Sequence, residues 1–184
     1  MRKLIVFNHV SVDGYFSSPH GDISWFKTGD AELAEYAIAS IAATGALVFG
    51  RVTYELMTHY WPTPMAKKND PVLAEWMNSL PKIVFSRTLA RAAWNNTRLV
   101  RENLEEEIRK LKKEPGKHMA LLGSGSIITQ LAPLGLIDEY QIMVNPIALG
   151  TGRTLFEGIR QKLTLKLAKT REFRNGCVLL TYAP

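Results

Sequence analysis

Cysteine is almost absent from this chain of 184 residues, because Cys177 is the only one. An intrachain disulfide is therefore impossible, and a reducing compartment is compatible with the sequence. Cys177 begins the apolar run Cys177-Val178-Leu179-Leu180. We therefore expect a buried structural thiol rather than a nucleophile.

Long hydrophobic runs are also missing. The N-terminal run, residues 4–7, is too short for the core of a signal peptide, and no run approaches the roughly 20 apolar residues of a transmembrane helix. With 46% hydrophobic and 22% charged residues, the composition is that of a globular protein. We expect a cytoplasmic protein without a membrane partner, forming a single domain over residues 1–184. No metal site is predicted.

A basic stripe interleaved with aromatic residues is lacking, although the net charge is +6. Most charges are mixed, as in residues 101–113, where Glu105/Arg109 and Glu106/Lys110 have the i,i+4 spacing of helical ion pairs and Asn103 is a predicted N-cap. This pattern argues against a nucleic-acid partner. The positive charge instead favours a phosphorylated small molecule.

Apolar runs and turn residues predict an alternation of strands and helices. Strands are expected at residues 4–12, 46–49, 82–85, 118–122 and 138–144, and helices at 51–57, from Pro71, after Asn103, at 127–132, and from Asp30 to a stop at Gly45. Asn175-Gly176 predicts a closing hairpin between residues 163–173 and 177–182. The fold class is therefore α/β, with a mostly parallel sheet and an antiparallel C-terminal hairpin.

Three polar or glycine-rich segments follow predicted strands directly. They are Gly50-Arg51-Val52-Thr53, Ser86-Arg87-Thr88, and Gly123-Ser124-Gly125-Ser126 with the adjoining Ile127. If these strands are parallel neighbours, all three segments lie at one edge, where arginines, hydroxyls and close backbone approach suit a ligand with several phosphates, such as NADPH. Each segment by itself is also compatible with a plain turn, and the third has Ile128 where the dinucleotide fingerprint has its last glycine.

The order of the motifs along the chain resembles the dihydrofolate reductase-like superfamily, most closely the branch related to the reductase domain of the bifunctional riboflavin-biosynthesis deaminase-reductase. The motifs that carry the resemblance include Val10-Ser11-Val12-Asp13-Gly14, Leu47-Val48-Phe49-Gly50-Arg51-Val52-Thr53-Tyr54, Pro81-Lys82-Ile83-Val84-Phe85-Ser86-Arg87-Thr88, the Gly-Ser-Gly turn, and Pro146-Ile147-Ala148-Leu149-Gly150-Thr151-Gly152. They cover nearly the whole chain. Ser124 departs from the family pattern, which commonly has glycine there.

The resemblance implies a single-domain, NADPH-dependent reductase with a twisted sheet flanked by helices, often a homodimer. Arg51 and Thr53 would hold phosphate at a helix start, Ser86 and Arg87 would meet the ribose 2′-phosphate, and residues 123–127 would hold the pyrophosphate. Val10, Asp13 and Gly14 would lie near the nicotinamide. The substrate would be a small heterocycle of the pterin, pyrimidine or flavin-precursor type. The alternative is a catalytically silent ligand-binding protein on the same fold.

Four further residues are candidates for the substrate site. Asp30 follows Trp25 at a spacing similar to that of the substrate-binding acid of dihydrofolate reductases, so it is a candidate for anchoring or protonating the substrate; its alternative role is a helix cap. Trp25 and Phe26 either stack on a planar substrate or pack their own loop. Asn145, before Pro146, either faces the pocket or ends its strand.

Overall fold

The computed structural model describes residues 1–26 and 30–184, so part of the loop predicted at residues 17–29 lies outside the described residues. The chain divides into two compact units. Unit 1 contains Met1–Leu4 and Tyr36–Ser124, and unit 2 contains Ile5–Glu35 and Gly125–Pro184. The expectation of a single domain stays a prediction.

Unit 1 contains a run of parallel strands in the order β5-β4-β3-β6. The strands are β3 (Thr44–Gly50), β4 (Lys82–Phe85), β5 (Thr97–Val100) and β6 (His118–Leu122). In β3, Leu47, Val48 and Phe49 are all buried. A continuous apolar run of this kind is typical of a parallel strand that is covered on both faces.

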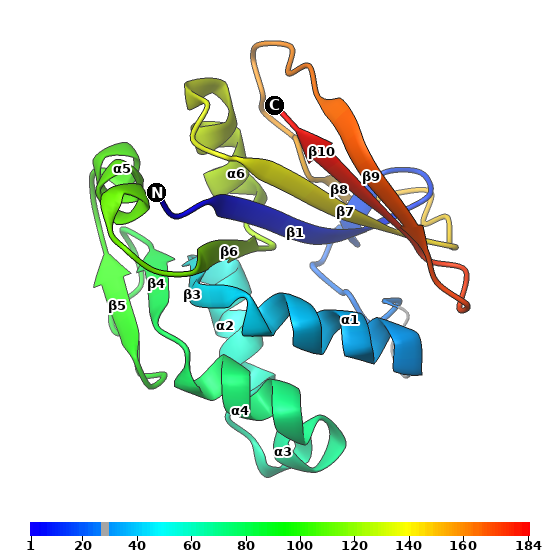
Figure 1. The fold of residues 1–184 in the computed structure, drawn as a ribbon, viewed down its shortest axis with the longest axis horizontal. Helices are drawn as coiled ribbons and strands as arrows, with labels where there is room; N and C mark the ends of the chain where they lie inside the picture. The colour runs from blue at the N-terminus through cyan, green and yellow to red at the C-terminus, as the bar shows by residue number, and fades with distance from the viewer. Residues whose placement is uncertain (27–29) are drawn as a thin grey trace. The chain divides into compact units, whose positions relative to one another are not determined.

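The helices of unit 1 are α2 (Arg51–Tyr60), α3 (Pro64–Asn69), α4 (Pro71–Ser79) and α5 (Leu104–Lys113). Helices α3 and α4 lie next to each other (Figure 1). Aromatic and aliphatic side chains from α2, α4, β3, β4 and the segment before β5 form one core: Leu47, Phe49, Tyr54, Met77, Leu80, Val84 and Trp94.

Unit 2 has the strand order β1-β7-β10-β9. Strand β1 (Leu4–Ser11) pairs in parallel with β7 (Glu139–Asn145), and β10 (Val178–Ala183) pairs antiparallel with both β7 and β9 (Lys166–Glu172). Figure 1 shows β9 and β10 as the orange and red hairpin. A short antiparallel pair, β2 (Tyr15–Ser17) with β8 (Arg153–Thr154), and helix α6 (Gly125–Leu131) with the 3₁₀ turn η1 (Ala132–Leu134) complete the unit.

The α/β class, the mostly parallel pairing and the C-terminal hairpin are confirmed. The hairpin turns at Gly176, whose φ is 87°. Cys177 is fully buried, as predicted from its apolar run. Among the described residues, no helix is long and apolar enough to cross a membrane.

The helix stop predicted at Gly45 was wrong, and Asn103 is the N-cap residue of its helix as predicted but does not cap it with its side chain. Helix α1 (Ala31–Ala42) ends before Gly45, and Gly45 itself lies inside β3. A Cβ at Gly45 would lie 3.0 Å from the Cβ of Lys117, which is closer than such atoms normally come. This glycine therefore permits close strand approach rather than stopping a helix. Asn103 precedes α5 but has a left-handed backbone (φ 57°) and makes no side-chain cap hydrogen bond. An N-cap that accepts a helix N–H normally has an extended backbone.

Lys82 is the one charged residue of β4, and it is deeply buried. Its side chain is 1% exposed, and Nζ donates to the carbonyls of Asn78 (3.1 Å), Leu80 (2.7 Å) and Asn95 (3.1 Å) while lying 4.5 Å from the ring centre of Trp94. Burial lowers the pKa of Lys82 to about 8, so the ammonium group is mostly protonated at pH 7. One cation thus satisfies carbonyls at the end of α4 and in the segment before β5.

Replacing this cation is expected to weaken the fold. Lys82→Met keeps most of the apolar stem but leaves three carbonyls without their donor, which should lower the free energy of unfolding by about 3 kcal/mol. Urea unfolding at pH 7 measures the difference. Lys68→Met, at an exposed position on α3, is the matched control and should change stability by less than about 0.5 kcal/mol. Equal effects of the two substitutions would contradict the role given to Lys82.

Candidate functional site

Unit 1 brings the predicted polar segments to one edge of its strands. Strand β3 pairs in parallel with β4, with Gly50 opposite Phe85, and also in parallel with β6. The carboxyl ends of the three strands therefore share an edge. Three segments follow them, here called the strand-end edge: Gly50–Thr53, Ser86–Thr88 and Gly123–Ser124. The neighbouring arrangement expected from the sequence is confirmed.

Ser124 joins two of these segments through hydrogen bonds. Its Oγ accepts the N–H of Gly50 (2.8 Å) and lies within donor distance of the carbonyl of Leu122 (2.9 Å) and Oγ1 of Thr53 (3.1 Å). Its own N–H donates to Oγ1 of Thr53 (3.0 Å). Ser124 is 7% exposed, so these bonds are largely shielded from water. The residue that departs from the family pattern thus has a structural role that the sequence did not indicate.

The turn before Ser124 requires glycine. Gly123 and Ser124 have φ values of 56° and 61°, two successive left-handed residues. A Cβ on Gly123 would lie 2.6 Å from Oγ1 of Thr53. Glycine is therefore needed for its backbone conformation and for the close approach of the turn to α2.

The N-terminus of α2 is without a side-chain cap. Gly50 is the N-cap residue, no side chain among residues 1–26 and 30–184 accepts a hydrogen bond from the first turn, and no acidic residue lies in that turn. The first N–H groups of a helix have no intrahelical acceptor and carry partial positive charge. Arg51 extends from this end and pairs with Glu55 (2.8 Å), both side chains remaining more than 40% exposed, while Val52 is 58% exposed. This end can accept an anion.

The segment after β4 presents a second cation. Ser86 Oγ accepts the N–H groups of Thr88 (3.2 Å) and Leu89 (2.9 Å), which shapes the turn. Arg87 is exposed, and no hydrogen bond joins its guanidinium to residues 1–26 or 30–184. Arg101 lies beside it, donating to the carbonyls of Arg87 (3.5 Å) and Ala90 (3.1 Å). Sequence reasoning missed Arg101, which looked like part of the charged helix.

In unit 2, Asp13 holds the turn at Leu149 and Gly150. Its carboxylate accepts the N–H groups of Leu149 (3.1 Å) and Gly150 (2.7 Å). Hydrogen bonds from Ser11 and from Gly150 lower the pKa of Asp13 to about 2. Gly14 forms the adjacent turn with φ 88°, and its N–H donates to Ser11. Within unit 2 these residues order the loop before β8.

Residues from the Gly-Ser-Gly turn and from the segment that ends the Pro146–Gly152 motif line one groove of unit 2, with a volume of about 510 Å³. Gly125 and Ser126, at the start of α6, lie on one side of it, and Thr151–Thr154 on another. Ile127, by contrast, is 5% exposed, so its side chain belongs to the core. The helix begins at Gly125 rather than at Ile127 as expected.

Four rings form a cluster in unit 2, here called the aromatic cluster: Phe7, His9, Trp25 and Phe26. Phe26 stacks on His9, with ring centres 4.4 Å apart and planes 16° apart, and Trp25 meets Phe26 edge-on at 4.6 Å. Phe7 packs edge-on against His9 at 5.3 Å. Burial lowers the pKa of His9 to about 4. Sequence reasoning missed His9, because nothing in its neighbourhood in the chain links it to the tryptophan loop.

Asn145 connects this cluster to the strands around it. The residue is fully buried, and Nδ2 lies 3.2 Å from Nδ1 of His9, 3.2 Å from the carbonyl of Val10 and 3.1 Å from that of Met143. Its Oδ1 accepts from Sγ of Cys177 at 3.5 Å. Val10, predicted near the cofactor, is 8% exposed. The structure thus brings Phe26 and Asn145 to His9, with Trp25 against Phe26.

Asp30 caps α1. Its Oδ1 accepts the N–H of Leu33 at 2.9 Å, and its carbonyl accepts that of Ala34 at 2.9 Å. The cap reading is therefore confirmed. The second carboxylate oxygen has no hydrogen bond to any residue among 1–26 and 30–184. The catalytic role stays a prediction.

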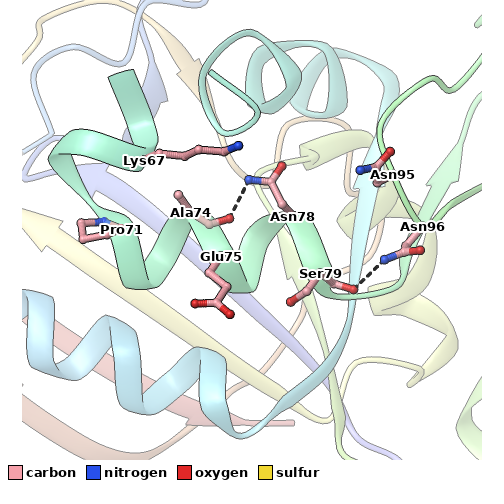
Figure 2. Close-up of a pocket in the computed structure, with 8 residues that line it drawn as sticks. All are labelled: Lys67, Pro71, Ala74, Glu75, Asn78, Ser79, Asn95 and Asn96. Carbon is pink, nitrogen blue, oxygen red and sulfur yellow. Dashed lines mark hydrogen bonds between the residues drawn. The ribbon is translucent and has the colours of Figure 1, made fainter. Parts of the chain in front are cut away.

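A further cavity of unit 1, about 590 Å³, lies beside α4 (Figure 2). Asn78 and Asn96 face it, but their amides are already used: Asn78 Nδ2 donates to the carbonyls of Ala74 (2.6 Å) and Trp61 (2.8 Å), and Asn96 Nδ2 to that of Ser79 (2.8 Å). The residues predicted for the cofactor or substrate do not line it. We read it as a structural groove between α4 and the segment before β5.

Two solved structures share the α/β fold of this chain. A putative riboflavin biosynthesis protein from Shewanella sp. PV-4 has a TM-score of 0.75, 24% identity and 98% coverage of both chains. A Thermotoga maritima diaminohydroxyphosphoribosylaminopyrimidine deaminase/5-amino-6-(5-phosphoribosylamino)uracil reductase has a TM-score of 0.71 and 15% identity over all of this chain and 56% of its own.

The chain belongs to the RibD C-terminal domain family, whose profile matches residues 2–179. A relative in sequence is the uncharacterized protein YyaP of Bacillus subtilis (strain 168), which is 31% identical over 182 residues, or 98% of this chain and 94% of YyaP. The family to which the motifs pointed is thereby confirmed.

The contact between Gly123 and Thr53 predicts a large effect of a small substitution. Gly123→Ala should lower the free energy of unfolding by about 3 kcal/mol, because the strain of a left-handed backbone is joined by a steric clash. Gly135→Ala is the matched control: its φ is similar at 63°, but nothing lies within 4 Å of the added Cβ. Thermal unfolding should show a loss of only about 1 kcal/mol there. Equal losses would remove the argument for close approach.

Protonation of His9 predicts a specific pH dependence of stability. Because the pKa is about 4 in the folded chain and 6.5 ordinarily, the unfolded chain binds more protons between these values, so stability falls as the pH is lowered from 6.5 to 4. The loss from this group is up to about 3 kcal/mol. His9→Phe should flatten the curve of unfolding free energy against pH in this range. His20→Asn, at an exposed position, should leave it parallel to that of the unmodified chain, and a parallel curve for His9→Phe would refute the assignment.

Proposed function

We propose that the protein is an NADPH-dependent reductase that transfers a hydride to a small planar heterocycle. The observation that carries the proposal is the uncapped N-terminus of α2 at the strand-end edge, with Arg51 beside it and the tight Gly123–Ser124 turn packed on Thr53. This arrangement supports binding of a phosphate group.

The residues fit the charge of the cofactor. The first N–H groups of α2 and the Arg51 guanidinium would hold the pyrophosphate together with the Gly123–Ser124 turn and the adjoining Gly125–Ile127. Arg87, assisted by the neighbouring Arg101, would hold the ribose 2′-phosphate, because an arginine without a protein partner is available for bidentate bonds to phosphate. Ser86 and Thr88 would shape this subsite.

Unit 2 supplies the residues proposed for the reacting end. NADPH supplies the hydride when bound. Val10 and Gly14 would contact the nicotinamide, and Asp13 would act by holding the Leu149–Gly150 turn in place. His9, Trp25 and Phe26 of the aromatic cluster would face a planar substrate, with Asn145 fixing His9 from behind.

The substrate class follows from the family and from this cluster. The Thermotoga relative is named for reduction of a substituted uracil, which supports a pyrimidine, pterin or flavin-precursor-like substrate here. Asp30 is the proposed acid: while one oxygen caps α1, the other remains available to anchor an amino group or assist protonation. We further propose a cytoplasmic homodimer.

Cofactor preference tests the proposal. The chain should bind NADPH more tightly than NADH, and Arg87→Ala should reduce the preference at least about tenfold by removing a charge-assisted bond to the 2′-phosphate. Arg51→Ala combined with Arg87→Ala should weaken NADPH binding further, as measured by calorimetry. Arg109→Ala is the matched control, because Arg109 pairs with Glu105 at i,i+4 (2.9 Å) as Arg51 does with Glu55. An unchanged NADPH affinity in the double variant would refute the site.

Turnover separates the reductase from a silent binding protein. Steady NADPH oxidation with a member of a panel of pterins, pyrimidinones and flavin precursors is expected. NADPH binding without oxidation across the panel would support the silent alternative instead.

A further inference from the structure

His9 is the polar residue at the centre of the aromatic cluster. It lies on β1 and is partly buried, with the face of its imidazole covered by Phe26 and its edge against Phe7. The two rings restrain its orientation. A polar ring held in this way has a defined direction for each of its nitrogen atoms.

The surroundings of Asn145 fix which nitrogen of His9 carries the proton. Nδ2 of Asn145 faces the carbonyls of Val10 and Met143, and Oδ1 faces the thiol of Cys177. Reversing this amide would place its oxygen against two carbonyl oxygens, so the atom near His9 is the amide nitrogen. An amide nitrogen only donates. Nδ1 of His9 is therefore the acceptor, and in the neutral ring the proton lies on Nε2.

Nε2 of His9 is thus an N–H donor that the described part of the chain does not use. It makes no hydrogen bond with any residue among 1–26 and 30–184. In the described parts of the chain, the fully enclosed side-chain atoms without a hydrogen-bond partner belong to His118 and Asn175. Nε2 of His9 is not among them. Because the pKa of His9 is about 4, the ring is neutral at pH 7 and this donor carries no charge.

We propose that His9 is a substrate-binding residue that donates its Nε2–H to an acceptor on the edge of a planar heterocycle. The inference rests on the proposed function and narrows its substrate class to rings with a carbonyl oxygen at that edge. A neutral donor of fixed direction selects between a carbonyl and an amino group, because the amino group would present its own N–H to His9 and leave both donors unpaired.

A matched pair of ligands tests the inference. 2,6-Diaminopyrimidin-4(3H)-one has a carbonyl and a ring N–H where 2,4,6-triaminopyrimidine has an amino group and an unprotonated ring nitrogen. With NADPH present, the unmodified chain should bind the pyrimidinone about tenfold more tightly, which corresponds to one neutral hydrogen bond. His9→Phe, which keeps an aromatic ring in the stack, should bind both compounds equally. His9→Gln, which offers an amide donor near the position of Nε2, should restore part of the preference.

The control variant is His20→Asn, which removes an exposed imidazole and leaves the rings around His9 unchanged; it should keep the tenfold preference. Imidazole ¹⁵N NMR of the unmodified chain provides a second measurement that needs no variant to fold. It should show a protonated Nε2 at pH 7 and a change in its N–H signal when the pyrimidinone is added, but not when His20→Asn is introduced alone.

Several outcomes would overturn the inference. They are an Nδ1-protonated ring, equal affinity of the unmodified chain for the two compounds, absence of pyrimidinone binding at millimolar concentration, or a preference that survives in His9→Phe. NADPH binding is measured separately by calorimetry. If NADPH binds and the His9 tests fail, only the inference about His9 falls, whereas failure of NADPH binding removes the proposed function itself.

Discussion

The arrangement of unit 1 depends on the way the chain leaves β6. Two successive residues, Gly123 and Ser124, have left-handed backbone conformations, and the turn they form is held against α2 by the Ser124 hydroxyl and by Thr53. The hydroxyl satisfies the N–H of Gly50 at the point where β3 passes into α2. A single side chain therefore ties the ends of two parallel strands. The left-handed backbone of Ser124 is costly for a residue with a Cβ, and its several hydrogen bonds offset that cost.

This contact also determines which groups remain for a ligand. Because Ser124 takes the N–H of Gly50, the donors left at the start of α2 are the N–H groups that follow it, and neither a side-chain cap nor an acidic residue of the first turn neutralises them. Arg51 is directed along its own helix by Glu55, yet the pair is exposed and such pairs contribute little. An incoming phosphate can therefore compete with Glu55 for the guanidinium. The hydrogen bonds of Ser124 hold the backbone in place, whereas Arg51 can exchange its partner Glu55 for a ligand.

The parts of the fold that could be predicted from the sequence are those set by local pattern. Buried parallel strands such as β4 follow from continuous apolar runs, and the hairpin follows from Asn175-Gly176. What could not be predicted depends on contacts between distant residues. Gly45 looked like a helix stop because its packing against Lys117 is 72 residues away in the chain, and β2 and β8 are too short to have a pattern. Among the candidate site residues, the polar segments were placed together as expected, whereas Arg101 and His9 gain their significance only from neighbours in space.

The two units present different chemistry to a ligand. In unit 1 the exposed groups of the strand-end edge are cations and backbone N–H donors, which recognise charge and tolerate variation in geometry. In unit 2 the aromatic cluster offers flat apolar surface and a neutral donor whose direction is fixed by Asn145, and Asn145 is itself oriented by the carbonyls of Val10 and Met143. A neutral donor of this kind gains little from charge and much from geometry, so it discriminates between ligands of similar size that differ in hydrogen-bonding pattern.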